Sequence, residues 1–400
     1  MNLQCTHSII KLIVLVFIVL PGILSAQEQP DSVLIPTAKE LKKARKDSIK
    51  AEKVAAGKSL ITPIAAPGYT PELGALIAIG GLWSFKTDRS NKDLQRSSFP
   101  ITFSYTTTNA VVFVGRPSTY WLDDKLRINA ELWYKDMPDN YWGVGFENAV
   151  NTPQSDSTTK YNREWFWINP QFLYQFKKNY FVGLNVDYNY TKGTEASAGV
   201  LADPNYQEFN DKPLNSGLGL ILRYDSRDIP VNAWSGLYVD LEATFYNEGL
   251  GGDNNYQIFI IDYRQYEQVG KKGQTMAWQI KARIGTGDIP YGEMSQLGNP
   301  FDLRGYIWGQ FRDKSLFFIL PEYRHTFYKK NGKISKHGMV VWAGTGTVFD
   351  FDNTDAQEVG WLPNFGFGYR LEVQPRMNLR VDIGMGRGTS GFYFNFNEAF

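Results

Sequence analysis

Cysteine and histidine are scarce in this sequence, which has one cysteine, Cys5, and three histidines among its 400 residues. Cys5 falls in a leader that we expect to be removed, so the chain beyond it has no thiol for a disulfide framework or a cysteine-ligated metal. Beyond the leader no window approaches 18 consecutive apolar residues, which excludes a bundle of membrane-spanning helices. The 42 basic and 41 acidic residues nearly cancel, which argues against a globally basic nucleic-acid-binding protein and against an acidic disordered chain.

The first 26 residues have the pattern of a secretory signal peptide. Lys11 precedes an apolar run over residues 12–20, and small residues follow up to Ala26. We therefore expect cleavage after Ala26 and export of the remaining chain. A retained membrane anchor is the weaker interpretation, because the run reaches a spanning length only if apolar residues on the other side of Lys11 are added.

Residues 27–68 differ in composition from the rest of the chain. The stretch from Ala38 to Lys58 is rich in lysine and alanine and contains no aromatic residue. Because it has few apolar residues with which to bury a face, we expect a charged, solvated periplasmic linker that includes at most a short helix. A segment that plugs a lumen or docks a partner is the alternative.

From residue 69 onward the sequence alternates apolar and polar residues with period two, which is typical of strands with two different faces. In the segment 236–248, Leu237, Leu241 and Phe245 share one face, whereas Asp240 and Glu242 share the other. The segments 273–286 and 361–374 alternate in the same way. A soluble β-sandwich needs apolar inner faces, but here the charged faces are as numerous as the apolar ones, and a polar lumen accommodates them.

Sixteen such segments are expected, most of them long enough to cross a membrane as tilted strands. Short connections near residues 178 and 375 contrast with long ones at 150–160, 194–214 and 287–313, as in an up-and-down barrel. The sequence therefore predicts an all-β fold, a transmembrane antiparallel β-barrel of about 16 strands over residues 69–400. The expected strands are 72–86, 97–107, 110–119, 124–135, 141–149, 161–177, 179–193, 215–226, 236–248, 254–268, 273–286, 314–328, 337–350, 361–374, 376–387 and 390–400.

Four motifs make the assignment more specific. They read "LRYDSRDIPVNAWSGLYVDL" from residue 222, "FDLRGY" from 301, "GTGTVFD" from 344 and "LRVDIGMGRGTSGFYFNFNEAF" at the end of the chain. Together, and in this order, they resemble the bacterial surface antigen barrel of the BamA/TamA outer-membrane protein superfamily. The resemblance covers residues 69 to 400. It implies a sixteen-stranded outer-membrane barrel whose sixth extracellular loop folds inward into the lumen.

The resemblance also implies roles for particular residues of that loop, which carries Leu303, Arg304, Gly305 and Tyr306. The motif arginine, Arg304, is expected to pair with acidic residues of the barrel wall, and Glu322 occupies the matching position on the following strand. The second acid of the family pattern is replaced by Gly344. The anchor is therefore expected to rest on Glu322, with support from Asp382.

The turn between residues 224 and 236 is rich in charge. Asp225, Arg227 and Asp228 are expected to close a local network at a periplasmic turn shaped by Pro230 and Gly236. A ligand or metal role for these acids is the sharper alternative, but a structural turn is favoured.

The first and last strands are expected to form a lateral seam. Gly74, Gly80 and Gly81 fall in the first expected strand and Phe400 ends the last one. Glycines weaken a strand edge, and an edge that opens can pair with an incoming strand. The alternative is that these glycines only relieve curvature or allow close packing, and the two interpretations have equal weight.

The expected function is assembly, insertion or translocation of polypeptides at the outer membrane of a Gram-negative bacterium. The expected partners are outer-membrane lipids, client outer-membrane or secreted polypeptides, and periplasmic or outer-membrane accessory proteins. The family's usual chain carries polypeptide-transport-associated (POTRA) domains before the barrel, and the polar residues 27–68 are too few to contain one. This departure leaves three options: a separate partner receives clients, the barrel handles them alone, or the protein serves another purpose.

Two other functions remain open. One is a passive pore or structural barrel in which the loop only plugs the lumen. The less favoured one is an outer-membrane lipolytic enzyme, which would have to use His325, because His337 falls in a polar turn. No catalytic residue, metal ligand or cofactor is assigned, and no nucleic-acid-binding motif is found.

Overall fold

The structure is a computed structural model that describes residues 38–70, 74–356 and 359–400. The predicted signal peptide lies outside the described residues. The chain divides into two units, residues 1–51 and 52–400. Helix α2 (Ala38–Ala55) supplies the described part of the first unit, and its alanine, lysine and glutamate residues are strong helix formers. In the described ranges no helix is long and apolar enough to span a membrane.

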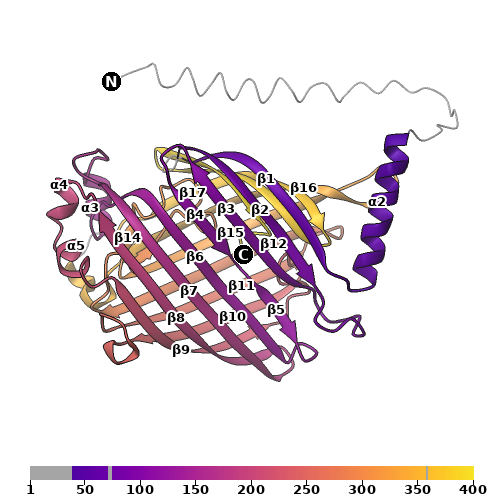
Figure 1. Cartoon of the computed structure of the whole chain (residues 1–400), viewed down its shortest axis with the longest axis horizontal. Helices are drawn as coiled ribbons and strands as arrows, with labels where there is room; N and C mark the ends of the chain where they lie inside the picture. The colour runs from indigo at the N-terminus through magenta and orange to yellow at the C-terminus, as the bar shows by residue number, and fades with distance from the viewer. Residues whose placement is uncertain (1–37, 71–73, 357–358) are drawn as a thin grey trace, which may run out of the picture. The chain divides into compact units, whose positions relative to one another are not determined.

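The second unit is built from one large antiparallel sheet in which consecutive strands pair along the chain, and Figure 1 shows it as the wall of a barrel. The strands β4 and β5 together fill one position between β3 and β6, because the ladder breaks at Arg116 and Pro117. The wall thus has sixteen strand positions, as predicted. Its strands are β1 (Leu60–Thr70), β2 (Gly74–Phe85), β3 (Ser97–Thr106), β4 (Val111–Gly115), β5 (Ser118–Trp121), β6 (Leu126–Asn140), β7 (Lys160–Lys177), β8 (Tyr180–Thr194), β9 (Leu214–Asp225), β10 (Gly236–Tyr246), β11 (Tyr256–Gln268), β12 (Gln274–Gly287), β15 (Ser315–Tyr328), β16 (Ile334–Phe349), β17 (Leu362–Gln374), β18 (Met377–Gly386) and β19 (Thr389–Phe396).

The remaining elements lie in the connections. The short helices α3 (Phe146–Asn151), α4 (Ala198–Leu201) and α5 (Pro204–Phe209) belong to the long connections that follow β6 and β8. Two 3-10 turns, η2 (Glu248–Leu250) and η3 (Phe351–Ala356), follow β10 and β16. The two-residue strands β13 (Ser295–Gln296) and β14 (Arg312–Asp313) pair with each other inside the connection between β12 and β15.

Two strand assignments made from the sequence are wrong. One strand was missed and one was predicted where none exists, so the number of strand positions is still sixteen. Residues 60–68, assigned to the linker, form most of β1, which Pro63 and Pro67 disguised because proline is rare within strands. The segment 141–149 is not a strand. Its Gly143 and Gly145 adopt φ values of +86° and +97°, which end the extended conformation before α3 begins.

The two faces of the strands are divided as the alternation predicts. On β10, Leu241 and Phe245 are exposed on the outer face, whereas Asp240 and Tyr246 are buried on the inner one. On the neighbouring β9, Leu220 is 59% exposed. A wall of exposed aliphatic and aromatic side chains around a charged interior suits hydrocarbon outside and water or protein inside. The reverse orientation would cost roughly 2–4 kcal/mol for each basic residue at mid-membrane depth.

The first and last strands of the wall, β1 and β19, lie next to each other. Strand β1 pairs with β2 over eleven residues, and β19 pairs with β18 over eight. Contacts bring β1 and β19 together, but no register of paired residues joins them in the part of the chain that the structure describes. Among the described residues, the barrel is therefore closed at this seam by contact between the two strands.

Candidate functional site

The connection between β12 and β15, residues 288–314, folds back into the barrel and is called loop 6 below. Its base is the β13–β14 pair. Its tip turns at Gly298, Gly305 and Gly309, whose φ values lie between +83° and +118°. Only glycine adopts such values without strain, so these residues fix the path of the loop.

Arg304 at the tip of loop 6 lies between two acids of the wall. Its Nη1 donates to Asp382 on β18 at 2.7 Å, and its Nη2 donates to Glu322 on β15. None of the three side chains is exposed to solvent. The ring of Trp342 on β16 lies 3.6 Å from the guanidinium carbon, which adds a cation–π contact. The structure thus brings together the three residues named from the sequence, Arg304, Glu322 and Asp382.

The two acids also belong to a larger buried network. Asp382 accepts from Arg370 at 2.5 Å and lies 3.5 Å from Arg380, while Glu322 pairs with Arg324 at 3.0 Å. Arg370 in turn binds Glu398 at 2.7 Å. Burying this much charge requires that nearly every group be paired. Four arginines, Arg304, Arg324, Arg370 and Arg380, share the acidic side chains of Glu322, Asp382 and Glu398, and Arg324 also donates to the terminal oxygen of Phe400 at 3.0 Å.

The neighbours of Arg304 in the motif fit closely against β18. A Cβ atom at Gly305 would lie 2.5 Å from the main-chain nitrogen of Met385, so no larger residue fits there. The ring of Tyr306 covers Gly386, and its hydroxyl donates to the main-chain oxygen of Pro363 at 2.7 Å. Leu303 is fully buried against this wall. All four residues of the LRGY motif therefore contribute to attaching the loop.

Gly344 has no side chain with which to bind Arg304, and two other residues, which the sequence did not single out, contact Arg304 instead. Trp342, two residues earlier on the same inward face, stacks on Arg304 and donates from its indole nitrogen to Asn364 at 2.9 Å. Asn364 donates to the main-chain oxygen of Arg304. A cation–π contact and a main-chain hydrogen bond thus stand where the family pattern has a carboxylate.

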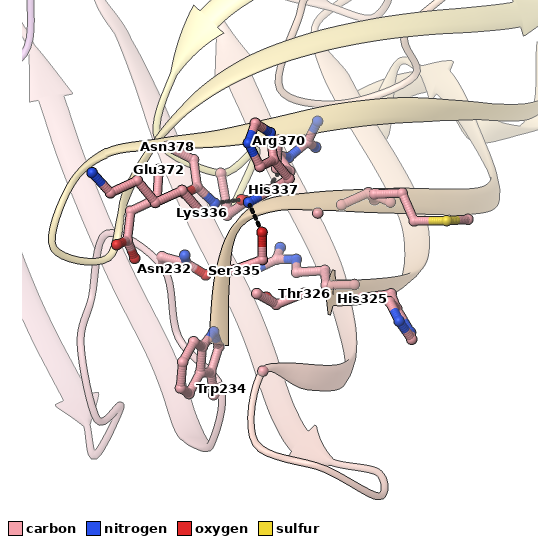
Figure 2. Close-up of a pocket in the computed structure, with 16 residues that line it drawn as sticks. Asn232, Trp234, His325, Thr326, Ser335, Lys336, His337, Arg370, Glu372 and Asn378 are labelled. Atoms are coloured by element: carbon pink, nitrogen blue, oxygen red, sulfur yellow. Dashed lines mark hydrogen bonds and ion pairs between the residues drawn. The ribbon is translucent and has the colours of Figure 1, made fainter. Parts of the chain in front are cut away.

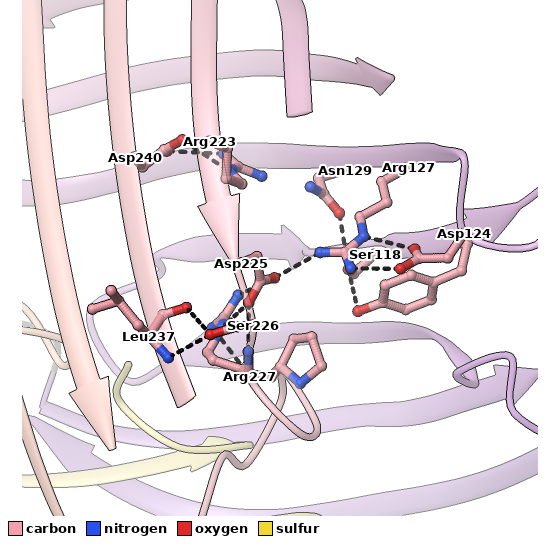
Figure 3. Close-up of polar contacts among 12 residues, drawn as sticks. Ser118, Asp124, Arg127, Asn129, Arg223, Asp225, Ser226, Arg227, Leu237 and Asp240 are labelled. Carbon is pink, nitrogen blue, oxygen red and sulfur yellow. Dashed lines mark hydrogen bonds and ion pairs between the residues drawn. The ribbon is translucent and has the colours of Figure 1, made fainter. Parts of the chain in front are cut away.

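Of the three residues predicted to form a network at the turn between β9 and β10, Asp225 and Arg227 bind each other (Figure 3). Asp225 accepts two hydrogen bonds from the side chain of Arg227, at 2.8 and 3.0 Å, one from its main-chain nitrogen at 3.2 Å, and one from Arg127 at 2.6 Å. Asp228 does not join this cluster. It binds Arg376 at 3.0 Å and accepts from the main-chain nitrogen of Trp234. These contacts agree with a structural turn.

The residues proposed for the seam are misplaced in the sequence-based assignment. Gly74, Gly80 and Gly81 lie on β2, which pairs with β1 on one edge and with β3 on the other. Phe400 lies four residues beyond the end of β19 and is buried, where its main-chain oxygen accepts from Arg324 at 3.0 Å. The error follows from missing β1, which shifts the seam by one strand.

The two histidines outside the predicted leader lie near a small cavity of about 20 Å³ at one end of the barrel (Figure 2). Their ring nitrogens contact tyrosine hydroxyls, His325 that of Tyr323 at 3.1 Å and His337 that of Tyr369. Ser335 accepts from the main-chain nitrogen of His337 rather than from its ring. These contacts do not assemble a serine, a histidine and an acid in the order that hydrolysis requires.

The fold and loop 6 define an antiparallel transmembrane barrel with an inward-folded arginine loop. Residues 77–400 match the model of the Omp85 superfamily domain. The chain belongs to the Omp85 superfamily and is an outer-membrane β-barrel of that family. No protein of curated function matches the sequence.

Solved structures with the same fold include BamA from Haemophilus ducreyi lacking POTRA domains 1–3, with 11% identity, 89% of this chain and 78% of that chain covered, and a TM-score of 0.51. CdiB from Escherichia coli is 8% identical over 85% of this chain and 61% of its own, with a TM-score of 0.54. CdiB from Acinetobacter baumannii is 10% identical over 85% and 59%, with a TM-score of 0.50. This chain spans about three fifths of each CdiB chain.

Proposed function

We propose that this barrel inserts or translocates polypeptides at the outer membrane and that the seam between β1 and β19 is where it opens. The observation that carries the proposal is that no ladder joins β1 and β19 among the described residues, so that parting the two strands breaks no β-sheet hydrogen bond described there. Family membership and the likeness in fold to BamA and CdiB support it. Export by the predicted signal peptide and contact with accessory proteins belong to the same proposal.

The two edges of the seam differ in what they offer to an incoming strand. Pro63 and Pro67 lie four residues apart on β1, so their nitrogens face the same edge. The ladder with β2 runs through both positions without a shift, and because a proline nitrogen cannot take part in a ladder, this supports the view that the missing donors face the seam edge. β19 contains no proline. An extended client strand is therefore expected to pair with β19 by β-augmentation.

Locking the seam with a disulfide tests this proposal. Ile61→Cys on the outer face of β1 is combined in turn with single cysteines at residues 389–396, in a strain depleted of the native protein. Oxidation is expected to stop growth and to lower the content of other barrel proteins in the envelope, and reduction is expected to restore both. Ile79→Cys with the same partners is the matched control, since Ile79 is exposed like Ile61 but lies on β2, which β1 separates from β19. Normal growth with the seam fully cross-linked refutes the opening.

A passive pore is the second candidate, because the lumen contains a cavity of about 870 Å³ whose lining includes charged and polar side chains as well as apolar ones. Loop 6 occupies part of the same lumen. Single-channel conductance of the purified protein separates the two functions: a large and steady open state in the parent protein favours a pore. Conductance that arises only in Arg304→Ala favours a lumen closed by loop 6.

A further inference from the structure

Loop 6 touches the barrel wall at a second place, on strands that take no part in binding Arg304. The indole of Trp308 meets Trp133 on β6 and Trp165 on β7 edge to face, with ring centroids 5.8 and 5.9 Å apart. Trp133 and Trp165 stack on each other at 5.7 Å. The loop residue thus completes an aromatic cluster that begins on the wall.

A lysine lies inside this cluster. The ammonium nitrogen of Lys135 is 3.6 Å from the ring centroid of Trp308, and it lies 4.6 and 4.7 Å from the rings of Trp133 and Trp165. Lys135 is buried. Cation–π attraction is stronger where water is excluded, so an ammonium ion shared by three indoles favours the position of Trp308 against β6 and β7.

Phe301, another residue of loop 6, also contacts two separate parts of the barrel wall. The ring centroid of Phe301 is 3.9 Å from the guanidinium of Arg116, which follows β4, and 5.0 Å from that of Arg380 on β18. Arg380 in addition donates to the main-chain oxygen of Pro300 at 2.9 Å. The tip of loop 6 is therefore in contact with strands from the first part of the wall and with strands from the last part.

We propose that Trp308 and Lys135 form a second attachment of loop 6, and that the tip of the loop leaves the lumen only when this attachment and the one at Arg304 are both broken. Both residues act by positioning the loop. The proposal goes beyond the function proposed above, since it holds whether the barrel handles polypeptides or is a pore. In this proposal loop 6 is held at two places across the lumen, by β6 and β7 and by β15–β18, rather than at one place only.

Chemical labelling of the loop tests the proposal on the full-length protein in its membrane. Cys5, the only cysteine in the sequence, is replaced by serine, and Ile307→Cys supplies a reporter beside Trp308. The rate of reaction with a membrane-impermeant maleimide then measures how often the tip is released. Loss of fast migration of unheated protein in SDS gels identifies any variant that has not folded.

Trp308→Ala and Lys135→Met are each expected to label about tenfold faster than the parent, because each removes an aromatic or cation–π attachment. The double variant Trp308→Ala/Lys135→Met is expected to label no faster than the faster single variant, since both changes break one contact. Combining Trp308→Ala with Arg304→Ala is expected to multiply the two effects. Trp308→Phe and Lys135→Arg keep a ring and a cation and are expected to label close to the parent rate.

Trp121→Ala is the matched control, because this tryptophan lies at the end of β5 and is 40% exposed. Parent-like labelling of Trp308→Ala and Lys135→Met, together with fast labelling of Arg304→Ala, would overturn the proposal. Multiplying effects of Trp308→Ala and Lys135→Met would show that the lysine does not act through Trp308. If Trp308→Ala does not fold, the labelling rates of Lys135→Met and Lys135→Arg are compared, and equal rates for these two variants would overturn the proposal.

Discussion

The guanidinium of Arg304 and the carboxylate of Asp382 lie 2.7 Å apart, although 78 residues separate them in the sequence and neither side chain is exposed. Glu322 binds the same guanidinium from another strand. A loop residue thus carries its charge into the barrel wall and meets an opposite charge on each side. Because Glu322 and Asp382 are each shared by more than one arginine, removing an acid and removing a cation should have different consequences.

Asp382→Asn should destabilise the barrel strongly. The change leaves Arg304, Arg370 and Arg380 facing an uncharged amide, and an uncompensated buried charge costs about 3–5 kcal/mol. We expect a clear drop in the temperature at which unheated-gel mobility of the folded barrel is lost. Arg304→Ala leaves both acids paired, since Asp382 keeps Arg370 and Glu322 keeps Arg324, so it should lower that temperature less while releasing the loop more. An equal drop for the two variants would contradict this difference in pairing.

Asp225→Asn should loosen the turn between β9 and β10. Asp225 is the carboxylate partner of Arg227 and is shared with Arg127, and hydrogen bonds to charged groups contribute about 1.5–3 kcal/mol each. Faster proteolytic cleavage within residues 226–235 measures the effect. Asp124→Asn is the control, because Arg127 keeps Asp225 when Asp124 is neutralised. Equal cleavage rates in the two variants would count against a turn held by Asp225.

The alternation of side chains predicted the barrel because the polarity of each residue indicates whether it lies on the outer or the inner face of the wall. Leu241 and Asp240 differ in exposure as their chemistry requires, and no knowledge of neighbouring strands is needed. The same local signal failed at β1, where the prolines that suit a seam edge look like loop residues. It failed again at 141–149, where apolar residues alternate but two glycines turn the chain.

Contacts across the lumen were only partly predictable. Glu322 was found because a motif fixes its distance from Arg304 along the chain. Trp342, Asn364 and the cluster around Trp308 were missed, because they depend on which strands face one another after the sheet closes. The tryptophan-rich run "EWFWIN" on β7 was the available signal, but an aromatic run in a strand is equally typical of a lipid-facing girdle.

Replacing Pro63 and Pro67 with valine should tighten the seam. Each substitution restores a main-chain donor on the β1 edge, where β19 offers acceptors. We expect the disulfide between Ile61→Cys and its best partner on β19 to form faster and more completely, and client insertion to slow. Substituting Pro100 on β3 with valine is the control, because this strand is paired on both edges. Unchanged cross-linking would show that the prolines do not keep the edges apart.

The attachment of loop 6 should weaken as the pH rises from about 4 to about 7. Burial raises the pKa of Asp302 to about 7, even though its carboxyl group accepts main-chain hydrogen bonds from Gly298 and Leu303 that oppose the shift. A carboxyl group with a raised pKa in the folded protein binds its proton more tightly there than in the released loop. Its stabilising contribution is therefore complete below the ordinary pKa of an aspartate and is lost as the pH passes 7.

Labelling of Ile307→Cys, corrected for the reactivity of a free thiol at each pH, should accordingly rise between pH 5 and pH 8. Asp302→Asn should remove most of this rise, because an amide keeps an acceptor for Gly298 and Leu303 but does not titrate. Asp288→Asn, in the same loop but outside its tip, should keep the pH dependence of the parent. A rise of the same size in Asp302→Asn would assign the titration to another group, and a loop that labels more slowly at pH 8 would contradict the direction of the shift.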